Sequence, residues 1–164
     1  MCRLYLYLMR YVKCDIIEIA GPAAIVHICN DLGHWGAGFT KSLSKKWPQA
    51  EKAYRAWAKN KVDHDNNPFK LGQISTVRVG TYNIVNMIAQ AGTVQHPAAW
   101  LPPIRYSALA CAMARTAAFV KFNDLPIYAP KFGSGLAGGE WEVIENMIKE
   151  IWVYRNIDVT ICYL

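Results

Sequence analysis

The glycine-containing segment HICNDLGHWGAGF, residues 27–39, contains two histidines, an asparagine and an aspartate. His27 lies in an apolar run that ends at Asn30 and Asp31, and His34 lies among the glycines that follow. A histidine or carboxylate beside a bound substrate can transfer a proton. His27, His34 and Asp31 are therefore the candidate catalytic residues.

Each of these side chains also has a structural interpretation. Strand alternation places His27 on the opposite face from Asn30 unless a bulge intervenes, which would make it a core histidine. His34 could be an exposed loop residue rather than a group near a terminal phosphate. Asp31 could close an Asx-turn instead of positioning a water. Trp35 could pack beneath the loop instead of over a ribose.

A second glycine-rich segment, PKFGSGLAGGEW at residues 130–141, stands between a short apolar run and a helical pattern. Helix N-termini offer free N–H groups and a positive dipole end to phosphates, and glycine lets the backbone approach closely. At Gly135 we expect both close approach and a positive φ, which would exclude a β-branched residue. The two loops predict a diphosphate held from both sides. Neither contains a P-loop or a Rossmann fingerprint, which argues against those nucleotide sites.

The elements that must position these loops follow from periodicity and turn signals. Strands are expected within residues 4–12 and over 23–30, 73–79, 82–90, 125–130 and 157–164. Helices are expected over 36–47, 48–58, 104–121 and 140–154, with a long proline-containing loop at 91–103. This alternation predicts an α/β fold, a three-layer α/β/α sandwich with a mixed, mostly parallel sheet, in one domain spanning 1–164. In such sheets, ligands bind outside the carboxyl ends of the strands, where both loops lie.

Composition restricts the class of protein further. With 164 residues, 53% hydrophobic, the chain is long enough for one packed globular core. The net charge of +6 suits an anionic ligand, a phosphate-rich small molecule as readily as nucleic acid. Five cysteines without a C-x-x-C pair predict a reduced, cytoplasmic protein without structural zinc, and we expect no metal and no cofactor. Arg10, Lys13 and Asp15 interrupt the N-terminal apolar run, which argues against a secretory signal or a membrane span.

Over nearly its whole length the chain resembles the macro domains, a family that binds ADP-ribose. YVKCDIIE at residues 11–18 resembles the family's opening Val-Lys-Gly-Asp pattern, with Cys14 in place of the glycine. IVHICNDLGHWGAGF at 25–39 resembles the first ligand loop of the subgroup that contains ADP-ribose 1''-phosphate phosphatases and terminal ADP-ribose glycohydrolases. PKFGSGLAGGEW resembles the diphosphate loop of that subgroup. The three motifs occur in family order.

The resemblance implies a role for each matching position. Asp15 would accept a hydrogen bond from the adenine amino group, with the Ile16 backbone beside it, and Asn30 would contact the distal ribose. Backbone amides would bind the phosphates. The first loop would be lined by Trp35, Gly36, Ala37, Gly38 and Phe39, with Gln90 nearby, and the diphosphate loop by Gly133, Ser134, Gly135, Leu136 and Ala137.

This chain differs from the glycohydrolase branch of the family at two positions. Gln90 stands where the glycohydrolase branch has its lysine, and Ala137 stands where the protein-directed enzymes have an aspartate. A histidine at the position of His27 instead matches the phosphatase branch. The expected function is therefore ADP-ribose binding with hydrolysis of the phosphomonoester of ADP-ribose 1''-phosphate.

Three alternatives remain open at the level of sequence. One is a glycohydrolase that removes ADP-ribose from protein or nucleic acid. Another is a reader that binds ADP-ribose or ADP-ribosylated macromolecules without catalysis, and the third is a nucleic-acid binder supported only by the charge. The expected partners are ADP-ribose or ADP-ribose 1''-phosphate, with no membrane. The sequence does not fix the oligomeric state, for which a monomer is the simplest expectation.

Overall fold

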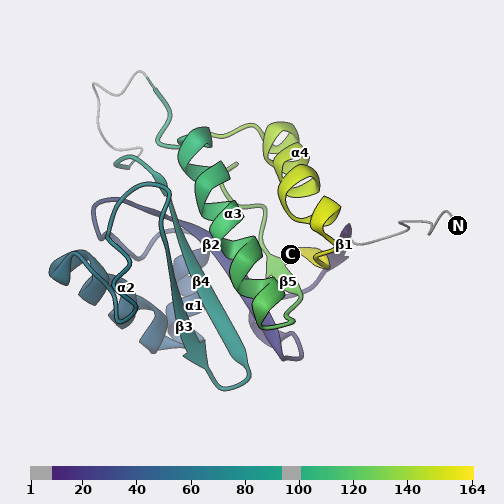
Figure 1. The fold of residues 1–164 in the computed structure, drawn as a ribbon, viewed down its shortest axis with the longest axis horizontal. Coiled ribbons are helices and arrows are strands. Elements are labelled where there is room, and N and C mark those ends of the chain that lie inside the picture. The colour runs from purple at the N-terminus through teal and green to yellow at the C-terminus, as the bar shows by residue number, and fades with distance from the viewer. Residues whose placement is uncertain (1–8, 94–100) are drawn as a thin grey trace, which may run out of the picture.

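A six-stranded sheet lies between two helical layers (Figure 1). The protein is represented by a computed structural model that describes residues 9–93 and 101–164. The strand order is β1-β6-β5-β2-β4-β3, and within the described residues β3 alone runs antiparallel to its neighbour. The strands are β1 (Met9–Lys13), β2 (Ala23–Asn30), β3 (Ile74–Val79), β4 (Tyr82–Gln90), β5 (Ile127–Ala129) and β6 (Val159–Tyr163).

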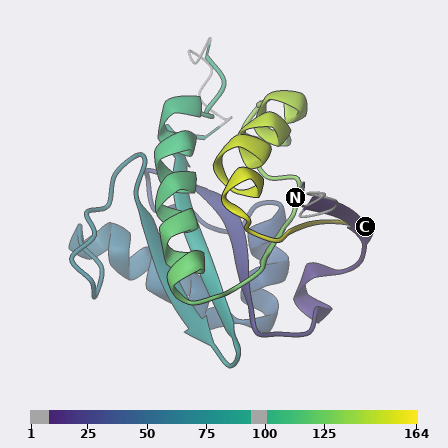
Figure 2. The same cartoon turned by 45° about the vertical axis from the view of Figure 1, so that its right-hand side comes forward.

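The helices cover both faces of this sheet, as the two views show (Figures 1 and 2). One layer holds the short helix η1 (Ile16–Glu18), α1 (Phe39–Lys46) and α2 (Pro48–Asn60). The other holds α3 (Tyr106–Phe122), α4 (Trp141–Ile151) and the short helix η2 (Val153–Arg155). The predicted three-layer α/β/α sandwich with a mixed, mostly parallel sheet is confirmed.

Residue pattern explains the central elements. The β-branched run at 23–30 forms β2 in the middle of the sheet, with side chains buried on both faces. Pro48 occupies the first turn of α2, where its missing N–H is harmless. Gly80, with φ +59°, turns the β3–β4 hairpin. These three features lie where the sequence predicts them.

Most predicted boundaries shift by one to three residues, and the two largest shifts are at the start of the first helix and the end of the last long helix. The first helix begins at Phe39 rather than residue 36, because Gly36 and Gly38 take φ values of +116° and +59°, which a right-handed helix does not allow. The last long helix ends at Ile151 and passes into η2 instead of continuing to residue 154. Strand β1 extends to Lys13, and the expected strand residues before Met9 lie outside the described residues.

Part of the loop expected at 91–103 also lies outside the described residues, at 94–100. In the part of the chain that the structure describes, no helix has both the length and the apolar character needed to cross a bilayer.

Candidate functional site

The two glycine loops face each other across a cavity of about 470 Å³ at the carboxyl ends of β2, β4 and β5. This is the position at which open α/β sheets bind ligands. Thirteen of the seventeen residues predicted for the site line the cavity. They are His27, Asn30, His34, Trp35, Gly36, Ala37, Gly38, Phe39, Gln90, Gly133, Gly135, Leu136 and Ala137.

Asn30 organises the first loop. Its amide oxygen accepts hydrogen bonds from the backbone N–H groups of Leu32 at 3.0 Å and His34 at 3.1 Å. Its amide nitrogen donates to the carbonyl of His34 at 2.8 Å. The amide keeps one N–H for a ligand, because each side-chain NH₂ group has two. The Asx-turn therefore belongs to Asn30, and the interpretation that Asp31 closes it is wrong.

Asp31 faces a different neighbour. Its carboxylate accepts a hydrogen bond from the backbone N–H of Gly92 at 2.9 Å, and its own N–H donates to the carbonyl of Gln90. These bonds tie the first loop to the segment that follows β4. Asp31 is not among the described residues that line the cavity. Its assignment as a catalytic residue stays a prediction.

His27 is a buried histidine at the floor of the cavity, with 2% of its surface exposed. Its ring meets those of Trp35 and Phe39 edge-on, with centroids 5.6 Å apart in both pairs. Nε2 lies 2.7 Å from the amide oxygen of Asn86 on β4, so Nε2 carries the proton. Burial lowers the pKa of His27 from its ordinary 6.5 to about 4, which keeps the ring neutral at pH 7.

The side chains of His27 and Asn30 reach the same cavity even though simple alternation would separate them. The pairing of β2 with β4 shifts between Cys29 and Asn30, so that Asn30 lies opposite Gln90 rather than the preceding residue. The extra residue is Ala89 of β4, so β2 has no bulge of its own. Both side chains line the cavity because it opens at the carboxyl end of β2, where Asn30 is the last strand residue.

His34 and Trp35 take different places in the first loop. His34 is exposed and lines the cavity. Trp35 is half-buried, its ring centroid 5.4 Å from that of Tyr54 on α2, and it also lines the cavity. Its indole N–H is buried and has no hydrogen-bond partner among the described residues. Trp35 therefore packs beneath the loop while one part of it reaches the ligand space.

The backbone after Trp35 is suited to anions. Thr40 holds the loop through its hydroxyl, which accepts from the N–H of Gly36 at 3.2 Å and donates to the carbonyl of Ala37 at 2.8 Å. Helix α1 then begins without a side-chain cap, leaving first-turn N–H groups directed toward the cavity end of the helix. These groups are available to a phosphate.

The second loop is a tight turn on the hydrophobic core. Gly133 has a φ of +79°, and a Cβ there would lie 2.9 Å from side-chain carbons of both Ile104 and Ile144. The N–H of Gly139 donates to the carbonyl of Gly133 at 2.7 Å. Gly135 differs, because its φ is not positive and a Cβ would meet no atom within 4 Å. The expectation of a positive φ at Gly135 is wrong, and the positive φ values of the turn are at Gly133 and Gly138.

Four predicted site residues lie away from the lining. Ser134 turns its hydroxyl to the carbonyl of Lys131 at 3.0 Å. Asp15 is exposed and caps η1, accepting from the N–H of Ile17 at 3.2 Å, while Ile16 is buried in the core under α1. With Asp31, these residues are outside the lining of the cavity in the described part of the chain. Their ligand roles stay predictions.

Seven further residues line the cavity and were not predicted from the sequence: Ile28, Cys29, Thr40, Thr93, Pro130, Lys131 and Phe132. Thr93 belongs to the loop at 91–103, and loops of that length are often functional. Lys131 holds its ammonium 5.7 Å from the ring of Tyr11 and 5.8 Å from that of Trp141, which places a positive charge at the rim. Burial raises the pKa of the Cys29 thiol, which leaves it a poor nucleophile.

The positive charge of the molecule is concentrated beside the first loop. Residues 39–61, which comprise α1, α2 and the C-cap Lys61, contain seven lysines and arginines and one glutamate, whereas the rest of the chain contains eleven residues of each sign. The whole net charge of +6 therefore resides in this segment. Among the described residues, no group of three or more metal-ligating side chains gathers to hold a metal ion.

Comparisons with known proteins agree with this architecture over nearly the whole chain. No family model matches. A protein of unknown function from Bacteroides thetaiotaomicron is 38% identical, with a TM-score of 0.88, and the alignment covers 97% of this chain and 99% of that one. A macrodomain protein from Streptomyces coelicolor is 35% identical, with a TM-score of 0.78, over 95% of this chain and 99% of that one.

Two other similarities are partial or distant. An ADP-ribose 1''-phosphate phosphatase from Aspergillus oryzae is 31% identical over 48 residues, which are 29% of this chain and 24% of that protein. The structure of Thermosipho africanus DarTG in complex with ADP-ribose shares the fold, with a TM-score of 0.67 at 13% identity, over 85% of this chain and 37% of that one.

Proposed function

The chain belongs to the macrodomain family, and we therefore propose that its cavity binds ADP-ribose and hydrolyses the phosphomonoester of ADP-ribose 1''-phosphate. The observation that carries the proposal is the pair of glycine loops facing one cavity at the carboxyl ends of three strands. Its volume of about 470 Å³ is in the range of small-molecule sites.

The parts of the ligand are assigned by the chemistry of each surface. The uncapped first turn of α1 and the amides of residues 133–137 hold the diphosphate, because backbone N–H groups bind phosphate without side-chain charge. Asn30 offers its remaining amide N–H to the distal ribose. Asp15 accepts from the adenine amino group, as the family resemblance implies.

Hydrolysis needs a water that attacks phosphorus while the bond from phosphorus to the ribose oxygen breaks. Inorganic phosphate leaves, and the ribose oxygen takes up a proton. Of the two histidines, His34 is the better proton-transfer group, because it is exposed in the cavity. The Nε2 of His27 is already bound to Asn86, and its Nδ1 lies 3.9 Å from the sulfur of Cys29. We assign His27 a positioning role beneath Trp35 and Phe39.

Residue chemistry also favours the phosphatase over the glycohydrolase. Gln90 lines the cavity at the end of β4, where the glycohydrolase branch has a lysine, and an amide cannot replace an amine as a nucleophile or base. The partial similarity to a protein named ADP-ribose 1''-phosphate phosphatase supports the same choice. ADP-ribosylated protein or nucleic acid is the substrate class of the alternative enzyme.

A three-substrate assay tests the proposal. The protein is incubated with ADP-ribose 1''-phosphate, with an ADP-ribosylated protein and with ADP-ribosylated DNA, and free phosphate and free ADP-ribose are measured. We expect phosphate release from the first substrate alone. ADP-ribose release from either macromolecule would support the glycohydrolase instead. Saturable ADP-ribose binding with no product from any substrate would identify a reader.

A further inference from the structure

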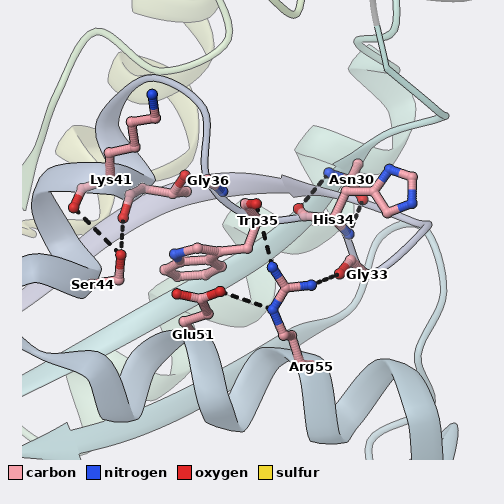
Figure 3. A network of polar contacts seen from close by, with 10 residues as sticks. Asn30, Gly33, His34, Trp35, Gly36, Lys41, Ser44, Glu51 and Arg55 are labelled. Atoms are coloured by element: carbon pink, nitrogen blue, oxygen red, sulfur yellow. Dashed lines mark hydrogen bonds and ion pairs between the residues drawn. The ribbon is translucent and has the colours of Figure 1, made fainter.

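Helix α2 holds the first loop through two consecutive side chains, Tyr54 and Arg55, neither of which lines the cavity. Figure 3 shows Arg55 rising from α2 to the loop, with Glu51 one turn earlier on the same helix. The Arg55 Nε donates to the carboxylate of Glu51 at 2.8 Å. The two remaining guanidinium nitrogens donate to the carbonyls of Gly33 at 3.3 Å and Trp35 at 3.4 Å.

The two carbonyls lie on either side of His34. One guanidinium therefore fixes the peptide before His34 and the peptide after Trp35, while the imidazole of His34 points away from Arg55 (Figure 3). A planar fork with donors on three nitrogens can join a carboxylate and two carbonyls, whereas a lysine ammonium is a compact charge with a single nitrogen. The geometry thus uses a property specific to arginine.

Tyr54 secures the start of the same turn. Its hydroxyl donates to the main-chain oxygen of Asn30 at 2.5 Å and lies 3.0 Å from the Asn30 amide oxygen, which in turn organises the N–H groups of the loop. Gly33 rests directly on the helix, since a Cβ there would lie 2.7 Å from the Cβ of Ala58. The turn from Asn30 to Trp35 is therefore built against α2.

The following segment is held independently. Gly36, Ala37 and Thr40 are joined by the Thr40 hydroxyl, and the second loop is braced by the core through Gly133. Both segments were assigned to the diphosphate. Releasing Arg55 should loosen the part of the site that receives the distal ribose and its substituent, and leave the part that receives ADP unchanged.

We infer that Arg55, held in place by Glu51, is a positioning residue that sets the loop backbone at residues 33–35 and the ring of Trp35 for the distal ribose, so that the site binds ADP-ribose more tightly than ADP. This inference rests on the proposed function, because the ligand is the one proposed there. Arg55 acts through the loop backbone and does not touch the ligand.

The test compares two ligands in four proteins. Calorimetry measures the dissociation constants of ADP-ribose and ADP for the wild type, Arg55→Ala, Arg55→Lys and the control Lys59→Ala. Lys59 is an exposed cation one turn further along α2. We expect Arg55→Ala to weaken ADP-ribose binding about tenfold, which is about 1.4 kcal/mol and the size of about one lost ligand hydrogen bond, and to leave ADP binding within about twofold. Arg55→Lys should restore part of the loss at most, and Lys59→Ala should match the wild type within about twofold.

Three results would overturn the inference. Unchanged ADP-ribose affinity in Arg55→Ala would show that the fork does not position the ligand. Equal weakening of both ligands would show a general structural role. Wild-type protein that binds neither ligand would remove the proposed function itself, and that result is distinguished by the wild-type titration alone. Glu51→Gln removes the charge of the partner carboxylate and keeps its shape. It should weaken ADP-ribose binding less than Arg55→Ala does and leave ADP binding unchanged.

Discussion

His27 and His34 belong to one short segment, and the fold gives them opposite environments. His27 is buried, neutral and bound to Asn86, whereas His34 is exposed at the ligand space. Strand alternation and loop position already offered these two interpretations, and contacts with β4 and α1 produce the burial of His27. For this reason we propose His34, rather than the His27 that the family resemblance favours, as the proton-transfer residue.

This assignment predicts a split between turnover and binding. His34→Ala should lower the rate of phosphate release by about 10²-fold or more, the range for losing a proton-transfer group, and keep ADP-ribose affinity within about threefold, since proton transfer adds little to ground-state binding. Single-turnover phosphate release and calorimetry measure the two effects. Full activity in His34→Ala would return the role to His27 or Asp31.

Burial of His27 predicts a specific dependence of stability on pH. Its pKa is about 4 when folded and 6.5 ordinarily, so between these values the unfolded chain binds a proton that the folded chain does not. This contribution to stability is fully present above pH 6.5 and is lost as the pH falls toward 4, by about 3 kcal/mol in total. Urea unfolding measures the free energy of unfolding at pH 7 and pH 4.5. The decrease between the two pH values should be smaller for His27→Gln than for the wild type. His64→Gln, a change at an exposed histidine, should keep the wild-type loss.

At the scale of elements, Gly133 and Gly135 of the second loop serve different purposes. Gly133→Ala should destabilise the fold by about 1–3 kcal/mol, because the residue needs a positive φ and its Cβ would press on Ile104 and Ile144. Gly135→Val should leave the unfolding temperature unchanged, because its surroundings are open. Thermal unfolding of both variants checks this. Equal stability loss in the two would contradict the distinction.

An element can be predicted from the sequence when the contacts that form it join residues close together in the chain. Strand β2, the hairpin turn at Gly80 and the start of α2 at Pro48 follow from local signals and are confirmed. The order of the strands in the sheet, and the contacts of Tyr54 and Arg55 with the first loop, depend on residues distant in sequence. Arg55, for example, reaches carbonyls 20 and 22 positions earlier. From the sequence alone, Arg55 is expected to be a solvated cation on a helix surface. The residues beside it in sequence do not predict which distant groups it contacts.

The same limit applies to the site. Residues with a distinctive type in a distinctive motif, such as Asn30 and Gly36, are predicted from the sequence and line the cavity. Cavity residues with common types, such as Ile28, Thr93 and Phe132, were not. Their position depends on which strand ends meet, and this is decided by packing of the whole sheet.

For the molecule as a whole, the concentration of charge in α1 and α2 predicts how an anionic ligand binds. Lys41 stands in the first turn of α1, two residues after Phe39 of the cavity lining. Lys41→Glu should weaken ADP-ribose binding by about two- to fivefold at low salt, and the difference should shrink above about 0.5 M salt because the charges are then screened. Lys121→Glu, at the far end of α3, should change the affinity much less. The same loss in both variants would mean that local charge does not matter.

The central claim is that the cavity between the two glycine loops binds ADP-ribose, and one paired titration tests it most directly. ADP-ribose is titrated by calorimetry into the wild type and into Gly135→Val. The added valine side chain occupies the space in which the ligand would contact the protein main chain at residue 135. The account predicts saturable one-site binding by the wild type and a loss of at least about tenfold in the variant, about 1.4 kcal/mol. No binding by folded wild-type protein, or equal affinity in both proteins, would contradict it.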